Sequence, residues 1–193
     1  MPENHCFSNE QKIAIQEEIN SLLKKGVIKK AEHSNQERVS PIFVVPKKDG
    51  KWRMILNLKD LNLDIEYKHF KMETFKDALA LITKGCFMCS LDLKDAYFSV
   101  HVNESSQEYL KFYWDNQLYT FTAFPNGLAC CPRLFTKLLK PVMAQLHLLG
   151  FISTFSLMTR CLLGKAERNV REICLLHLHY FKDLVLWSIQ RNQ

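Results

Sequence analysis

The sequence lacks the hydrophobic segments that membrane-spanning and secreted proteins carry. No apolar run approaches the ~20 residues that a helix needs to cross a bilayer. The N-terminal Met-Pro-Glu-Asn-His has no basic-then-apolar order of the kind found in a secretory signal. We therefore expect no membrane partner and an intracellular location, in the cytoplasm, the nucleus or both.

The cysteines also lack the pattern of a disulfide framework or a zinc site. The seven cysteines are an odd number and have no histidine partners at the spacing of metal ligands. The single Cys86-x-x-Cys89 motif lacks the second pair that a structural zinc site requires. We interpret these residues as reduced, mostly buried thiols.

The sequence contains no low-complexity segment, no internal repeat and no linker rich in Pro, Gly and Ser. With 47% hydrophobic, 24% charged and 11% aromatic residues, the chain has the composition of a folded domain and not of a disordered or fibrous protein. Its net charge of +6 favours a polyanionic partner such as nucleic acid, although many proteins of this charge bind none.

Local signals predict an α+β fold. Ser8 and Gln11 have the spacing of a capping box, and Gly26 is a typical helix end, so a helix is expected between them. The Asp49-Gly50 pair predicts the turn of a β-hairpin. Further strands and helices follow from the apolar patterns. The strands are expected at 27–28, 41–45, 52–58, 86–91, 109–114, 118–124, 151–155 and 161–163, and the helices at 74–85, through 135–146 and over 166–180.

Three ordered motifs carry a family resemblance. They are residues 43–53 (FVVPKKDGKWR), 90–99 (SLDLKDAYFS) and 124–128 (FPNGL). At this spacing they resemble the reverse transcriptases of retroviruses and retrotransposons. Residues 85–88 (GCFM), 125–129 (PNGLA) and 135–141 (FTKLLKP) most resemble those of DIRS-like elements, with gypsy-type elements next. The resemblance implies an RNA-directed DNA polymerase with a fingers and palm fold, in which helices back an antiparallel palm sheet.

The resemblance also implies a domain organisation. It assigns residues 1–193 to one reverse transcriptase-like domain, with about 1–85 mostly fingers and about 86–183 mostly palm. Residues 184–193 would form an aberrant tail. Because no segment resembles the family's thumb or ribonuclease H domain, we expect a truncated fingers–palm fragment.

Asp92 is the candidate catalytic residue and metal ligand. Nucleotide addition to a primer 3′-hydroxyl develops negative charge on phosphate oxygens, which two Mg²⁺ ions about 4 Å apart can stabilise. Mg²⁺ prefers hard oxygen ligands. The resemblance implies that the Asp92 carboxylate and the Leu93 carbonyl bind the metal. Without it, an Asp at the end of an apolar strand would be interpreted as a cap or turn residue.

The resemblance further implies a site for the incoming deoxynucleoside triphosphate (dNTP), beside a template-primer of RNA or DNA. Lys47 and Arg53 flank the Asp-Gly turn and would contact the triphosphate. The other implied contacts are the backbone amides of Asp95 and Ala96, Tyr97 as a gate against a 2′-hydroxyl, and Asn126 and Gly127. Asn126 stands where the family usually has Gln or Phe. The alternatives are a solvated basic hairpin at 47–53 and a core aromatic residue at 97.

The family's second metal-binding motif, an aromatic-x-Asp-Asp hairpin, falls on residues 156–159, which read Ser-Leu-Met-Thr. Met158 and Thr159 therefore stand at the two Asp positions. A soft thioether and a neutral hydroxyl cannot replace two carboxylates as Mg²⁺ ligands. We expect Mg²⁺ binding to be impaired and this copy to be inactive, a pseudoenzyme.

Local frameshifts would explain this substitution. Residues 157–161 can be encoded as TTG ATG ACN CGN TGY, which reads GAT GAC NCG NTG from the third base and permits the family's Asp-Asp-Ser-Leu. Residues 184–193 read at the same offset permit Gly-Phe-Val-Val-His-Pro-Glu-Lys-Ser, similar to the family's continuation. Simple divergence of the hairpin is the alternative.

Two other functions remain open from the sequence. The chain could be a non-catalytic nucleic-acid-binding module, because phosphate contacts supply most nonspecific affinity and need no metal. It could also be a decayed element copy without function. Salt-dependent binding without primer extension would distinguish the binding module from a polymerase.

Overall fold

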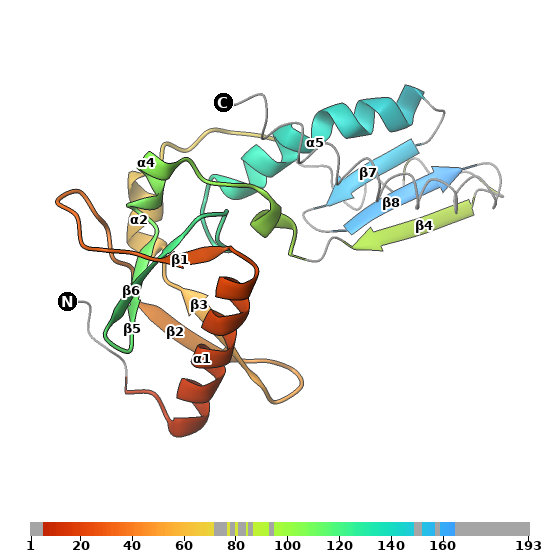
Figure 1. Cartoon of the computed structure of the whole chain (residues 1–193). Coiled ribbons are helices and arrows are strands. Elements are labelled where there is room, and N and C mark those ends of the chain that lie inside the picture. Colours follow the sequence, from red (N-terminus) through yellow and green to blue (C-terminus); the bar gives the residue numbers. More distant parts are fainter. Residues whose placement is uncertain are drawn as a thin grey trace. The chain divides into compact units, whose positions relative to one another are not determined.

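The structure of this protein is a computed structural model that describes residues 6–71, 77, 80, 84, 87–92, 95–148, 152–156 and 159–164 (Figure 1). For the strands within 87–92, 152–156 and 159–164 it describes the backbone. The predicted helix over 166–180, the tail 184–193 and most of the helix predicted at 74–85 lie outside these residues. The chain divides into two units, the first formed by Met1–Tyr67 with Tyr97–Cys131 and the second by Lys68–Ala96 with Pro132–Gln193.

The first unit begins with α1 (Asn9–Lys24), whose predicted boundaries are confirmed. The Ser8 hydroxyl accepts from the Gln11 backbone, and the Gln11 side chain accepts from the Ser8 backbone, which completes the capping box. The helix ends before Gly26, whose φ of 69° is in the left-handed region. Its buried face packs against β1 (Ile28–Lys30) and β3 (Trp52–Leu56). That face consists of Ile15, Ile19 and Leu22.

Two antiparallel sheets build the rest of the first unit. One has the strand order β1-β6-β5, with β5 at Lys111–Trp114 and β6 at Gln117–Phe121. The other is the hairpin of β2 (Ile42–Pro46) with β3. In the first sheet the fully buried Phe112 ring stacks on Tyr119 at 5.4 Å and lies 5.7 Å from Phe121, so aromatic contacts form this part of the core.

Three short helical segments in and beside the first unit were not predicted. They are α2 (Lys59–Asp64), the 3₁₀ helix η1 (Ala96–Ser99) and α4 (Glu104–Gln107). The strand expected to reach residue 58 ends at Leu56, because the Asn57 side chain accepts a hydrogen bond from the Lys59 backbone and turns the chain into α2. The strand expected over 118–124 ends at Phe121.

A buried lysine anchors the segment between β1 and β2. Lys111 is 1% exposed, and its Nζ lies 2.9 Å from Glu37 Oε2, 2.7 Å from Glu108 Oε2 and 2.7 Å from the Glu32 carbonyl. A hydrogen bond from His33, followed by those from Lys111 and the Ser34 backbone, lowers the pKa of Glu37 to about 2 against the opposing effect of burial. Burial acts to lower the pKa of Lys111, but the two carboxylates outweigh it and the net shift is upward.

The second unit contains a sheet with strand order β4-β8-β7 and the helix α5. The strands are β4 (Phe87–Asp92), β7 (Ile152–Ser156) and β8 (Thr159–Gly164), and all their pairings are antiparallel. α5 (Cys131–Leu148) confirms the predicted helix, and it buries Phe135 and Leu139 at i, i+4 spacing. No helix in the described ranges combines the length and apolar character of a membrane span.

Candidate functional site

The β2–β3 hairpin carries the two residues predicted to contact a triphosphate. The Lys47 amide donates to the Lys51 carbonyl at 2.6 Å, and Gly50, with a φ of 77°, closes the turn. Because Val45 pairs with Arg53, and Lys47 lies two residues beyond Val45 and opposite Lys51, the alternation of the strands puts Lys47, Lys51 and Arg53 on one face. The hairpin therefore presents three cations on one face, which suits a polyphosphate.

The loop with the predicted residues Asn126 and Gly127 is held by a side chain from α2. Asn62 Nδ2 donates to the Gly127 carbonyl at 2.9 Å, and Asn62 Oδ1 accepts from the Ala129 amide at 2.8 Å. Asn126 itself is exposed, and Gly127 has a φ of 95°, which favours glycine. The buried Cys131 thiol contacts the Pro125 carbonyl at 3.8 Å from the other end of the loop.

Sequence reasoning missed Asn62, because its partners lie 65 and 67 residues away and leave no local signal. Replacing Asn62 with Ala is expected to lower the free energy of unfolding by about 1–2 kcal/mol, since two hydrogen bonds to the loop backbone are lost. Urea denaturation measures this. Asn62→Asp keeps the acceptor for Ala129 but sets a carboxylate oxygen against the Gly127 carbonyl, so its loss should be at least as large. An unfolding curve of Asn62→Ala equal to that of the parent would contradict this role.

Tyr97 lies in η1, next in the fold to the Asn126 loop. The segment after η1 pairs with the segment before the loop. The Val102 amide donates to the Thr122 carbonyl at 2.8 Å, and the Phe124 amide donates to the Val100 carbonyl at 2.9 Å. This pairing explains why β6 stops at Phe121. It also brings Tyr97 and Asn126, two of the predicted nucleotide contacts, near each other in the fold although they are far apart in the chain. The Tyr97 ring is 6% exposed, and burial raises its pKa.

Asp95 and Ala96 precede Tyr97 directly. Asp95 is exposed and has a φ of 56°, a left-handed conformation that Asp tolerates, and Ala96 is the first residue of η1. Leu93, the second predicted metal ligand, lies outside the described residues.

Asp92 is the last residue of β4, as predicted, and its backbone pairs with Thr159 at the start of β8. Thr159 pairs in turn with Ser156 at the end of β7. The β7–β8 hairpin therefore turns next to Asp92, at the position expected for the second metal-binding motif. Met158 lies outside the described residues.

A pair of Mg²⁺ ions does not fit the donors at this hairpin. Thr159, whose backbone pairs with Asp92, has a neutral hydroxyl in place of a carboxylate, and the sequence has no Asp or Glu from 151 to 165. In the part of the chain that the structure describes, no three His, Cys, Asp or Glu side chains gather in a group that could hold a metal ion.

Comparison with protein families gives one assignment. The family described as "Reverse transcriptase (RNA-dependent DNA polymerase)" matches residues 45–190. A Pro-Pol polyprotein of simian foamy virus type 3 (strain LK3) is 34% identical over 125 residues, which are 65% of this chain and 11% of that protein. The transposon Tf2-3 polyprotein of Schizosaccharomyces pombe is 27% identical over 132 residues, 68% of this chain and 10% of that protein. This chain thus spans about a tenth of these polyproteins.

Solved structures share the fold. A foamy viral protease-reverse transcriptase in complex with dsDNA superimposes with a TM-score of 0.75 at 24% identity, over 95% of this chain and 36% of that one. The native crystal structure of prototype foamy virus protease-reverse transcriptase gives a TM-score of 0.71 at 23% identity, over 97% of this chain and 24% of that one. The predicted α+β fold of reverse transcriptase fingers and palm is confirmed.

Proposed function

Because this chain belongs to the reverse transcriptase family, we propose that it binds a template-primer and a dNTP as a retroelement RNA-directed DNA polymerase domain does, while this copy has lost nucleotidyl transfer. The observation that carries the proposal is the pairing of Asp92 with Thr159. It supports the alignment of 156–159 with the family's aromatic-x-Asp-Asp hairpin. Under that alignment, Asp92 is left without the two carboxylates that two-metal catalysis needs.

The proposed dNTP contacts keep their chemistry. Lys47 and Arg53 share one hairpin face, as a point charge and a bidentate fork for phosphate oxygens. Tyr97 and the Asn126 loop are neighbours in the fold, which supports contacts of both with the sugar and base of one nucleotide. Asp95 and Ala96 would supply backbone amides, and Gly127 lets the loop approach closely. Nucleotide binding would thus outlast catalysis.

Several finer parts of the proposal rest on the sequence alone. The motifs favour a DIRS-like or gypsy-type element, with fingers over about 1–85 and palm over about 86–183. Frameshifts near residues 157 and 184 account for the lost Asp pair and for the tail. The coding DNA across residues 150–193 tests this directly, because in-frame divergence would leave no shifted reading of the family motif.

Primer extension tests the loss of catalysis. The parent chain is expected to extend no primer with Mg²⁺ or Mn²⁺, because two of three metal-binding carboxylates are replaced. The control is Asp92→Ala, which removes the remaining carboxylate. Incorporation by the parent above this control would overturn the proposed inactivity.

Restoration tests the alignment. The Met158→Asp, Thr159→Asp double variant should recover Mn²⁺ binding measurable by titration calorimetry, since Thr159 pairs with Asp92 and Met158 directly precedes Thr159 in the chain. Adding Asp92→Ala to the double variant should remove this binding. Equal, negligible heats for the parent and the double variant would mean that residues 156–159 are not the metal-binding hairpin.

A further inference from the structure

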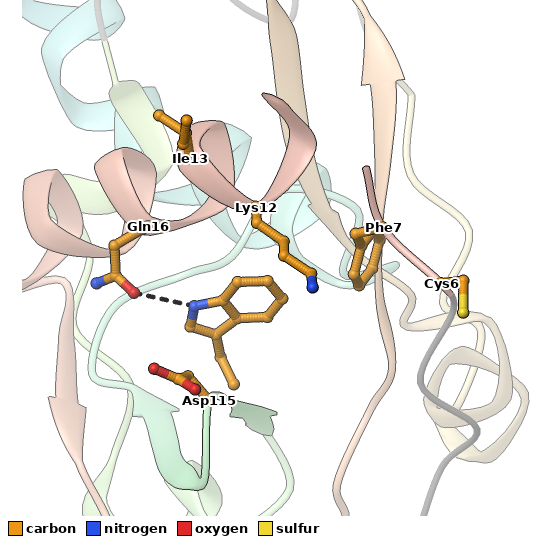
Figure 2. A pocket seen from close by; sticks show the side chains of 7 residues that line it. Cys6, Phe7, Lys12, Ile13, Gln16 and Asp115 are labelled. Atoms are coloured by element: carbon orange, nitrogen blue, oxygen red, sulfur yellow. Dashed lines mark hydrogen bonds between the residues drawn. The ribbon is translucent and has the colours of Figure 1, made fainter. Parts of the chain in front are cut away.

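The first unit has a cavity of about 560 Å³ on the side of α1 where the helix begins (Figure 2). Lys12, Ile13 and Gln16 line it from the first two turns of α1, and Trp114 and Asp115 line it from the end of β5. None of these residues belongs to the site proposed for the dNTP. The volume lies within the range of about 300–1,000 Å³ that is usual for small-ligand sites.

The Trp114 indole is held in a fixed orientation. Its Nε1–H donates to Gln16 Oε1 at 3.0 Å, the dashed line in Figure 2, and the Phe7 ring packs against it at 5.7 Å with 61° between the planes. The side chain is nevertheless only half-buried. With its N–H already bonded, the indole has an aromatic surface left to offer a ligand, which suits stacking of a second flat ring.

Two opposite charges accompany this aromatic surface. Lys12 and Asp115 both line the cavity with Trp114, and Figure 2 shows the Lys12 amine and the Asp115 carboxylate apart from each other. Lys12 can pair with an anionic group, and Asp115 can accept hydrogen bonds from amino groups on a ring edge. A ligand that matches all three features has a flat aromatic ring, an anionic group on one side and an amino edge on the other.

We propose that this cavity binds one unpaired nucleotide of single-stranded nucleic acid, with its base stacked on Trp114 and its phosphate paired with Lys12. Aromatic side chains beside basic groups are the usual means by which proteins hold single strands. Asp115 favours bases with an exocyclic amino group, as carboxylates do when they accept from cytosine N4. The inference rests on the proposed nucleic-acid binding and adds a second contact surface to it.

The test compares a blunt DNA duplex with the same duplex carrying a single-stranded oligo(dC) overhang, by fluorescence anisotropy. The parent should bind the overhang form more tightly. Trp114→Ala should weaken binding of the overhang form about fivefold or more, the effect of losing roughly 1 kcal/mol of stacking, and leave the blunt duplex unchanged. Trp114→Phe keeps a ring and should keep most of the affinity, which separates lost stacking from misfolding.

Charge variants provide independent readouts. Lys12→Gln should make the salt dependence of overhang binding less steep by about 0.7, whereas Lys59→Gln, an exposed lysine of the same unit, should not. Asp115→Asn suits the left-handed φ of 45° and should remove the preference for oligo(dC) over oligo(dT) overhangs.

The outcomes separate the two proposals. Blunt-duplex binding without a gain from the overhang, or a gain that Trp114→Ala leaves intact, overturns the single-strand site and spares the proposed function. Binding of neither substrate overturns both.

Discussion

Replacing Lys111 with Met is expected to lower the free energy of unfolding by about 3 kcal/mol. The variant keeps most of the length of the side chain but leaves the carboxylates of Glu37 and Glu108 without their shared cation. Breaking a buried ion pair costs about 3–5 kcal/mol. The lower end applies here, because the side chains of Glu37 and Glu108 keep 15% and 40% of their exposure and can be hydrated. With total stabilities of about 5–15 kcal/mol, such a loss is large.

Urea denaturation of Lys111→Met beside Lys29→Met measures this effect. Lys29 is exposed on β1 of the same sheet, so its replacement should change stability little. Adding Glu37→Gln and Glu108→Gln to Lys111→Met should recover part of the loss, since no carboxylate is then left unpaired. Equal stabilities of the two single variants would show that the buried amine is not an anchor.

The same network predicts a pH dependence. The pKa of Glu37 is lowered to about 2 in the folded chain, so its stabilising contribution is present above a pH of about 4.5 and is lost as the pH falls toward 2. The pKa of Lys111 is raised, so its contribution is present below its ordinary value of 10.5 and is lost at higher pH. The stability difference between the parent and Lys111→Met should therefore shrink below pH 4.5.

Neutralising the basic residues of the β2–β3 hairpin is expected to weaken binding of duplex DNA about a hundredfold near 0.1 M salt. The variant carries Lys47→Gln, Lys48→Gln, Lys51→Gln and Arg53→Gln. Each phosphate contact contributes about −0.9 to the slope of log K against log salt concentration. One contact therefore raises the binding constant at about 0.1 M salt close to tenfold relative to its value at about 1 M salt. The expected factor corresponds to the loss of two phosphate contacts among the three cations that share one face.

The control is a variant with four exposed lysines of the same unit replaced by Gln, namely Lys24, Lys29, Lys30 and Lys59. It has the same net charge as the hairpin variant and should lose much less affinity. Binding that stays flat between low and high salt, or that survives neutralisation of the hairpin, would refute an electrostatic interface at this place. Equal losses in both variants would mean that the whole unit contributes through its net charge.

Elements formed by neighbouring residues were predictable. The capping box at Ser8 and the glycine at 26 define α1, and Asp49-Gly50 defines the β2–β3 turn, because caps and tight turns depend on a few consecutive residues. The strand that ends at Asp92 was likewise predictable, because a run of consecutive apolar residues indicates it. Errors arose where a distant segment decided the boundary, as at Phe121, where the chain leaves β6 to pair with residues 100–102.

The sequence by itself determined the family, through the order and spacing of its three motifs, and the absence of a carboxylate at Met158 and Thr159, since residue identity is independent of the fold. Only the tertiary structure decided that Asn62 holds the Asn126 loop, that Lys111 is buried between two carboxylates, and that Trp114 borders a cavity with α1. Apart from Glu108, which lies three positions from Lys111, these contacts join residues 65 to 98 positions apart, and strand pairing and helix packing, which no short sequence pattern encodes, bring them together.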